Sequence, residues 1–153
     1  MTLDSLFDPD VHQALKHRLT GLRPDSTARW GRMSAHQTVC HLADALRLVL
    51  GERPTAFQSN LLLRTVMRFA ALTLPMPWPK GTDTAPELDQ ERGGTAPTEF
   101  GADKDDLTAL IDRFVTLSGR NMAIHPIFGN LTRGEWGRCG YRHLDHHLTQ
   151  FGL

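Results

Sequence analysis

Apolar residues recur at intervals of three or four along most of this 153-residue chain, which is the spacing of one face of an α-helix. Two of these runs begin with a capping box, in which a side chain and a backbone amide satisfy each other: Ser34 with Gln37, and Thr132 with Glu135. Hardly any segment alternates as a strand would. The sequence therefore predicts an all-α fold, most simply a four-helix bundle with a short extra helix, in a single domain spanning 1–153.

Glycine and proline residues mark where the helices end. We predict helices over 9–20, from Ser34 to Gly51, over 58–73, over 103–117, and from Thr132 nearly to the end of the chain. The run at 58–73 is apolar over much of its circumference, and we therefore expect this helix to be well buried.

The segment 74–103 breaks the helical pattern. Its many prolines and glycines disfavour regular structure, and an irregular connection this long is uncommon in a small domain. Such a segment often covers a functional site, and Trp78 and Phe100 favour one that packs on the rest of the protein. An inert surface loop is an equally good interpretation at this point.

Composition argues against several classes of protein. The chain has 17 basic and 17 acidic residues, interspersed, so its formal charge is zero and no nucleic-acid-binding surface is indicated. Arg64 and Arg68 interrupt the longest apolar stretch, so no membrane span is expected. The first residues lack the pattern of a signal peptide. We therefore expect a cytoplasmic protein in which Cys40 and Cys139 are reduced.

Two histidines near the C-terminus share one helix face. His143 and His147 are spaced i, i+4, which places two imidazoles one turn apart, where both can ligate one metal ion. On a helical wheel this pair sits at the edge of the core-facing stripe, whereas His146 turns toward solvent. The alternative is that both histidines merely hydrogen-bond to their neighbours, and the spacing alone does not decide between the two.

A third ligand has to come from elsewhere in the chain. His36 and His41 both belong to the helix that follows Ser34, and they lie at similar angles on either side of its apolar stripe. Geometry alone therefore leaves both open. The small side chain of Ala45, one turn after His41, leaves room for a pocket and gives His41 a weak preference.

The segment Trp30–Gly51, the segment His125–Trp136 and the run from His143 to Gly152 resemble the signatures of the domain-of-unknown-function 1569 branch of the DinB-like superfamily. The resemblance covers both ends of the chain, and the central segment adds nothing to it. It implies a four-helix bundle of DinB-like type, with a metal triad of one histidine on the second helix and an HxxxH pair on the last. The matching residues are His41, His143 and His147. Some members of the superfamily resemble thiol-dependent S-transferases, but this branch has no settled reaction to transfer.

Such a triad suits several divalent metals. Neutral imidazoles bind Zn²⁺, Ni²⁺ or Fe²⁺, and the ligand set does not distinguish them. A fourth position can hold water or a thiol, whose pKa the metal lowers. We therefore expect a metal-dependent hydrolase or thiol-dependent transferase. Its substrate would be a small molecule, with a low-molecular-weight thiol as one candidate. The protein could form a homodimer. The alternative is a noncatalytic binding or stress-associated protein whose metal stabilises the bundle, and a metal site closed by Cys139 would favour this alternative.

His125 and Asp44 are the candidate catalytic residues. His125 lies beside a proline, can reach the mouth of the pocket, and with a pKa near neutrality would serve as a general acid or base. A loop-anchoring role for it has equal weight. Asp44 lies one turn after His41 and can accept the second N–H of a ligating histidine or carry a proton. Asp145 fits a solvated helix charge better.

Overall fold

The computed structural model describes residues 3–54, 56, 60–117 and 122–153. Within these ranges the chain is all-helical, as the sequence predicts, with no strand and with a single isolated bridge between His125 and Gly129. A short 3₁₀ helix, η1, lies in the irregular segment. The helices are α1 (Pro9–Thr20), α2 (Ala35–Val49), α3 (Leu61–Thr73), η1 (Pro86–Leu88), α4 (Phe100–Val115) and α5 (Arg133–Gln150).

Local capping explains where the helices begin. Both predicted capping boxes are present, Ser34 with Gln37 on α2 and Thr132 with Glu135 on α5. The helix α4 begins earlier than predicted because Glu99 caps it, accepting hydrogen bonds from the amides of the first turn. The predicted start of the third helix, at residue 58, falls outside the described residues, and α3 is helical from Leu61.

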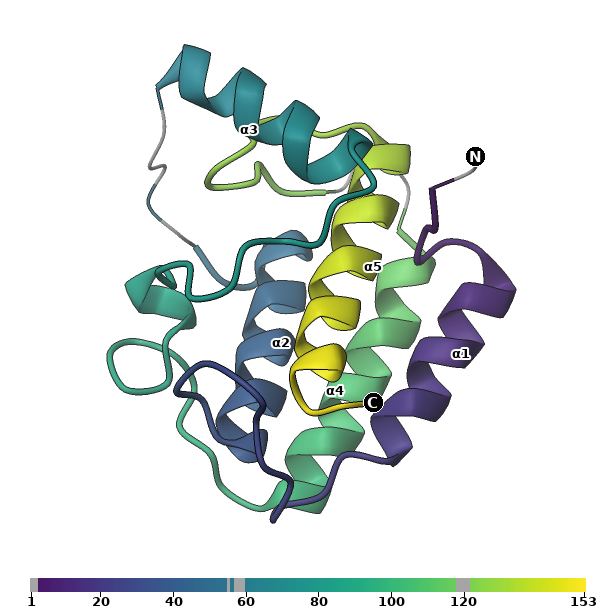
Figure 1. Cartoon of the computed structure of the whole chain (residues 1–153), viewed down its shortest axis with the longest axis vertical. Helices are drawn as coiled ribbons and strands as arrows, with labels where there is room; N and C mark the ends of the chain where they lie inside the picture. Colours follow the sequence, from purple (N-terminus) through teal and green to yellow (C-terminus); the bar gives the residue numbers. More distant parts are fainter. Residues whose placement is uncertain (1–2, 55, 57–59, 118–121) are drawn as a thin grey trace.

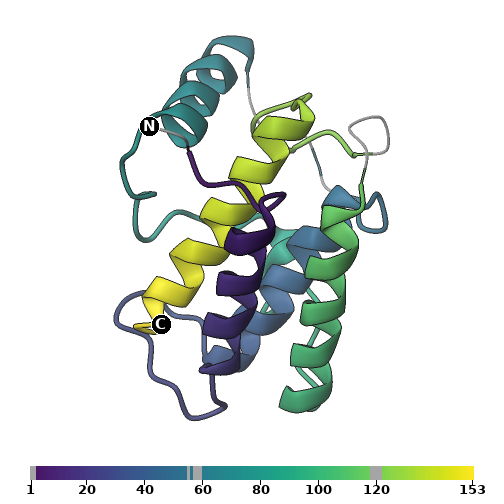
Figure 2. The ribbon, with the colours of Figure 1, turned by 90° about the vertical axis from the view of Figure 1, so that its right-hand side faces the viewer.

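Four helices run side by side, and the fifth crosses one end of them. In Figures 1 and 2, α1, α2, α4 and α5 lie next to one another, and α3 crosses over their upper end. The packing of α2 on α4 is the most extensive helix contact, and α5 touches both α1 and α2. The core between these helices includes the fully buried side chains of Leu15, Val39, Leu42, Leu107 and Phe114.

The expectation that the third helix is well buried is wrong. Leu61, Leu62 and Phe69 of α3 expose 68%, 77% and 58% of their surface. The physical reason is the position of α3. This helix packs on the N-terminal part of α5 at one end of the other helices, which leaves much of its apolar surface exposed. Apolar residues on all sides of a helix therefore did not translate into burial here.

A glycine of α5 lets the N-terminal segment pack on this helix. The amide of Leu6 donates to the carbonyl oxygen of Gly137 at 2.9 Å, and the side chain of Leu6 is fully buried. A Cβ atom on Gly137 would lie 2.2 Å from the Ser5 hydroxyl and 2.5 Å from the Phe7 ring, so no larger residue fits without movement. This contact fixes the first residues against the middle of α5.

Buried carboxylates anchor the irregular segment. Asp89, beside η1, is 1% exposed and accepts hydrogen bonds from Arg32 at 2.5 Å and Arg92 at 2.8 Å. The backbone amide of Glu91 makes the largest contribution to lowering the pKa of Asp89 to about 2, and the two arginine contacts lower it further. The segment is thereby held close to α2.

Among the residues that the structure describes, none of the helices combines the length and the apolar character that a membrane span requires.

Candidate metal centre

Three histidines meet between α2 and α5. His41 comes from α2, and His143 and His147 come from successive turns of α5. The Nε2 atoms of His41 and His143 lie 2.9 Å apart, and the ring centroid of His147 lies 4.8 Å from that of His41 and 5.0 Å from that of His143. One nitrogen from each ring lies within 4.8 Å of the other two, so the group has the spacing needed to hold a metal ion.

All three imidazoles are neutral at physiological pH. Burial lowers the pKa of His41, lowers that of His143 well below its usual value, and lowers that of His147 to about 3. The rings also disfavour one another's charge, which lowers the pKa of His143 and His147 further. A neutral imidazole offers a lone pair to a metal, whereas a protonated one does not.

Hydrogen bonds fix which nitrogen of each ring faces its neighbours. The Nδ1 atom of His41 lies 2.9 Å from the carbonyl oxygen of Leu88, which can only accept, so Nδ1 carries the proton. The Nδ1 atom of His147 lies 2.9 Å from Oε1 of Gln150, and the amide nitrogen of Gln150 donates to the Trp30 carbonyl at 2.6 Å, which fixes the orientation of that amide. In both rings Nε2 is left with a lone pair. These are the second contacts expected of metal-ligating histidines.

A cavity of about 880 Å³ opens beside the three rings. Its walls are mostly apolar: Trp30, Leu46, Met67, Phe128 and Trp136 contribute from different parts of the chain. Trp78, from the irregular segment, lies 5.9 Å from His143 between ring centroids, and its indole nitrogen donates to the Ala71 carbonyl at 3.0 Å. The irregular segment therefore forms a wall on the same side of the molecule as the histidines.

His125 also lines the cavity, but its charge state differs from the sequence-based expectation. Its Nδ1 atom accepts the backbone amides of Ile127 and Phe128, each at 3.1 Å, so the proton resides on Nε2. Burial lowers its pKa to about 4 instead of leaving it near neutrality. At neutral pH, His125 is therefore an uncharged hydrogen-bond donor.

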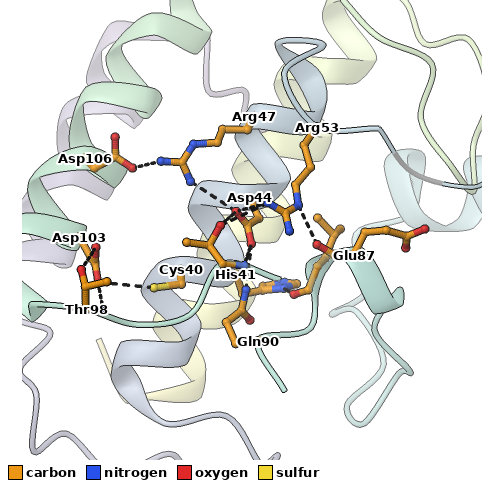
Figure 3. Close-up of polar contacts among 12 residues, drawn as sticks. Cys40, His41, Asp44, Arg47, Arg53, Glu87, Gln90, Thr98, Asp103 and Asp106 are labelled. Carbon is orange, nitrogen blue, oxygen red and sulfur yellow. Dashed lines mark hydrogen bonds and ion pairs between the residues drawn. The ribbon is translucent and has the colours of Figure 1, made fainter. Parts of the chain in front are cut away.

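Asp44 binds the irregular segment. Its fully buried carboxylate accepts the Thr95 amide and hydroxyl, both at 2.7 Å, and the Gln90 amide at 3.1 Å. Arg53 and Arg47 complete the cluster at 3.2 and 3.3 Å (Figure 3). These contacts satisfy both carboxylate oxygens, so Asp44 ties α2 to the segment that carries the Leu88 carbonyl.

The remaining candidates lie outside the histidine cluster. Asp145 pairs with Arg18 at 2.7 Å on the surface. Cys139 lines the cavity one turn before His143, but it is not part of the group that has metal-binding spacing, and burial raises its pKa to about 12. His36, the other candidate for the third ligand, pairs instead with Asp103 at 2.7 Å.

Residues 3–152 match the model of a family described as protein of unknown function (DUF1569). The chain belongs to this family. No curated protein and no solved structure matches it.

Sequence reasoning did not identify three contacts that shape the site in this DUF1569 member. Gln150 lies three residues after His147, so helical spacing offered a signal for it. The Leu88 carbonyl and the Thr95 contacts to Asp44 had no such signal, because a backbone acceptor carries no side-chain signature and both residues lie in an irregular segment far along the chain from α2.

Proposed function

We propose that this protein binds one divalent metal ion, Zn²⁺, Ni²⁺ or Fe²⁺, through His41, His143 and His147, and that it is a metal-dependent enzyme. We further propose that α1, α2, α4 and α5 form a four-helix bundle of the DinB-like type. The observation that carries the metal site is the pair of outward contacts, to the Leu88 carbonyl and to Gln150. They direct the lone pairs of two neutral rings toward the third.

The cavity supports a catalytic role over a purely structural one. A bound metal with three histidine ligands lowers the pKa of a water or thiol at its remaining position and so supplies a nucleophile. The chain itself supplies an apolar cavity beside the three histidines, large enough for a small organic substrate. The apolar walls favour an apolar substrate, attacked either by water or by a low-molecular-weight thiol.

The two candidate catalytic residues take different roles in this proposal. His125 lines the cavity with a proton on Nε2, so it would donate a hydrogen bond to a polar atom of the substrate. Asp44 acts through the irregular segment: by holding Gln90 and Thr95 it fixes the nearby Leu88 carbonyl, and thus the tautomer and orientation of His41. In this proposal Asp44 is a positioning residue.

Metal analysis of matched histidine variants tests the site. All the proteins are purified without an affinity tag. The His147→Ala variant should contain one equivalent of metal less than the wild-type protein. His146→Ala is the control, since His146 precedes His147 and also lines the cavity but packs against Trp30 and Trp78. Equal metal content in the two variants would contradict the assignment.

A second experiment addresses the open position. In a Cys40→Ser, Cys139→Ser protein, which has no thiol of its own, an added thiol should appear as a sulfur ligand in X-ray absorption at the metal. A metal whose ligands neither a thiol nor a small anion ever changes would favour the noncatalytic, metal-stabilised alternative.

A further inference from the structure

A second group of ligand types lies on the side of α2 that faces α4. His36 and Cys40 are spaced i, i+4 on α2, and Asp103 lies in the first turn of α4. The Oδ2 atom of Asp103 is 2.7 Å from Nε2 of His36 and 3.8 Å from Sγ of Cys40. One ligand atom from each of the three residues lies within 4.8 Å of the others.

The carboxylate in this group is held in place by its neighbour. The Thr98 hydroxyl donates to Oδ1 of Asp103 at 3.0 Å, and the Thr98 amide donates to Oδ2 at 2.9 Å. The hydroxyl contact orients the carboxylate so that Oδ2 faces both His36 and Cys40. Figure 3 shows Cys40, Thr98 and Asp103 converging at this point. Phe100 packs edge-on against the His36 ring, with 5.4 Å between centroids.

Burial differs across the group in a way that suits a cation. Cys40 is 3% exposed, whereas the side chains of His36 and Asp103 are 22% and 20% exposed. A cation can therefore reach the imidazole and the carboxylate from solvent, while the sulfur closes the inner side. The Cys40 thiol donates to the same Oδ2 atom that pairs with His36, so an imidazole, a thiol and a carboxylate meet at one oxygen atom.

We propose that His36, Cys40 and Asp103 form a second metal site, for a borderline-soft divalent cation such as Zn²⁺. Sulfur, imidazole and carboxylate together are typical zinc ligands, and this set does not suit Mg²⁺ or Ca²⁺, which take oxygen ligands. On binding, Cys40 releases its thiol proton to solvent. His36 gives up the Nε2 proton that it donates to Asp103 and keeps its remaining proton on Nδ1, so the contact between His36 and Asp103 is replaced by one bond from each residue to the cation. The thiolate and the carboxylate together cancel the charge of the ion.

This charge balance separates the two sites. A cation at the three neutral histidines keeps its positive charge, whereas a cation between Cys40 and Asp103 is neutralised by its ligands. The second site also joins the N-terminal half of α2 to the start of α4 and to Thr98, at the end of the irregular segment. Its role is therefore structural, and it does not depend on the function proposed for the histidine cluster.

Cobalt spectroscopy tests this site separately from the histidine cluster. A Co²⁺ ion bound to a cysteine gives a thiolate-to-metal charge-transfer band in the near ultraviolet, and a Co²⁺ ion bound only by histidines does not. The Co²⁺-loaded protein should show this band, and Cys40→Ser should abolish it. The band should persist in Cys139→Ser, which removes the other thiol, and in His147→Ala, which removes a ligand of the first site.

Two further variants keep the test decisive if Cys40→Ser fails to fold. His36→Gln, at a partly exposed position, should weaken Co²⁺ binding to this site, as measured by titrating Co²⁺ and following the intensity of the charge-transfer band. Thr98→Val removes only the hydroxyl that orients Asp103. It should weaken the Co²⁺ affinity of the site by about 10-fold or more, as the loss of a hydrogen bond to a ligating residue does in other metal sites. No band in the wild-type protein at excess Co²⁺, a band lost in Cys139→Ser instead, or equal affinity in His36→Gln would each overturn the proposal.

Discussion

Acidification should lower the free energy of unfolding of this protein, because protonation of His125 favours the unfolded chain. The unfolded chain titrates this residue near its ordinary pKa of about 6.5. In the folded protein burial lowers that pKa to about 4. Because the folded pKa is the lower one, the unfolded chain takes up the proton first, and stability falls as pH drops below about 6.5 until it approaches 4.

The two values fix the size of the effect. Between about pH 7 and pH 5, the protonation of His125 alone should cost about 2 kcal/mol of the free energy of unfolding, and the full loss by pH 4 approaches about 3 kcal/mol. The matched variant is His125→Asn, since an asparagine side-chain oxygen can accept the Ile127 and Phe128 amides in place of Nδ1 and does not titrate.

Urea unfolding followed by far-UV circular dichroism measures the effect. The wild-type protein and His125→Asn are compared at several pH values in the presence of a chelator, so that metal release contributes to neither curve. The three clustered histidines titrate in both proteins, and their contribution cancels in the difference. A difference between the two proteins that stays constant from pH 7 to pH 5 would refute the conclusion that His125 is a buried, neutral donor.

Three further changes test the packing and the buried charges. Asp44→Asn should lower the free energy of unfolding by about 2–3 kcal/mol, because buried donors from Thr95 and Arg53 lose a charged acceptor, and thermal melting would measure this. Gly137→Ala should cost about 1–3 kcal/mol by overpacking against Ser5 and Phe7, whereas Gly134→Ala on the same helix, with nothing near its Cβ position, should be neutral or slightly stabilising. Phe114→Ala should cost about 3–5 kcal/mol through the cavity that it leaves in the core, as measured by urea unfolding.

The features that were predictable from sequence are those set by local interactions. The capping boxes at Ser34 and Thr132 involve residues three positions apart, so a short stretch of sequence contains all the information they need. The same holds for the pair His143 and His147, whose common helix face follows from their spacing. Helical spacing alone left His36 and His41 open, because it does not contain the packing of α2 on α5; the family resemblance decided for His41.

The exposure of α3 shows the limit of periodicity as a guide. The positions of Leu61, Leu62 and Phe69 indicate a helix, and this was right. Whether another element covers that helix depends on where the chain leads it. The helix α3 lies across the end of the other helices, and its most extensive helix contact is with α5. Hydrophobicity therefore predicted which residues favour burial, but not which residues find a partner.

The polar residues of α2 show why the histidine cluster stands apart from its neighbours. A buried polar group left without a partner costs about 1–3 kcal/mol. Asp44 obtains donors from Thr95 and Gln90, and His36 obtains a carboxylate. For His41, the Nδ1 atom has the Leu88 carbonyl as its partner, whereas the Nε2 atom faces another imidazole nitrogen, that of His143. The Nε2 atoms of His41 and His147 both present lone pairs, and His143 is the one ring of the cluster left to donate a proton to them. A cation is the partner that would satisfy all three rings at once.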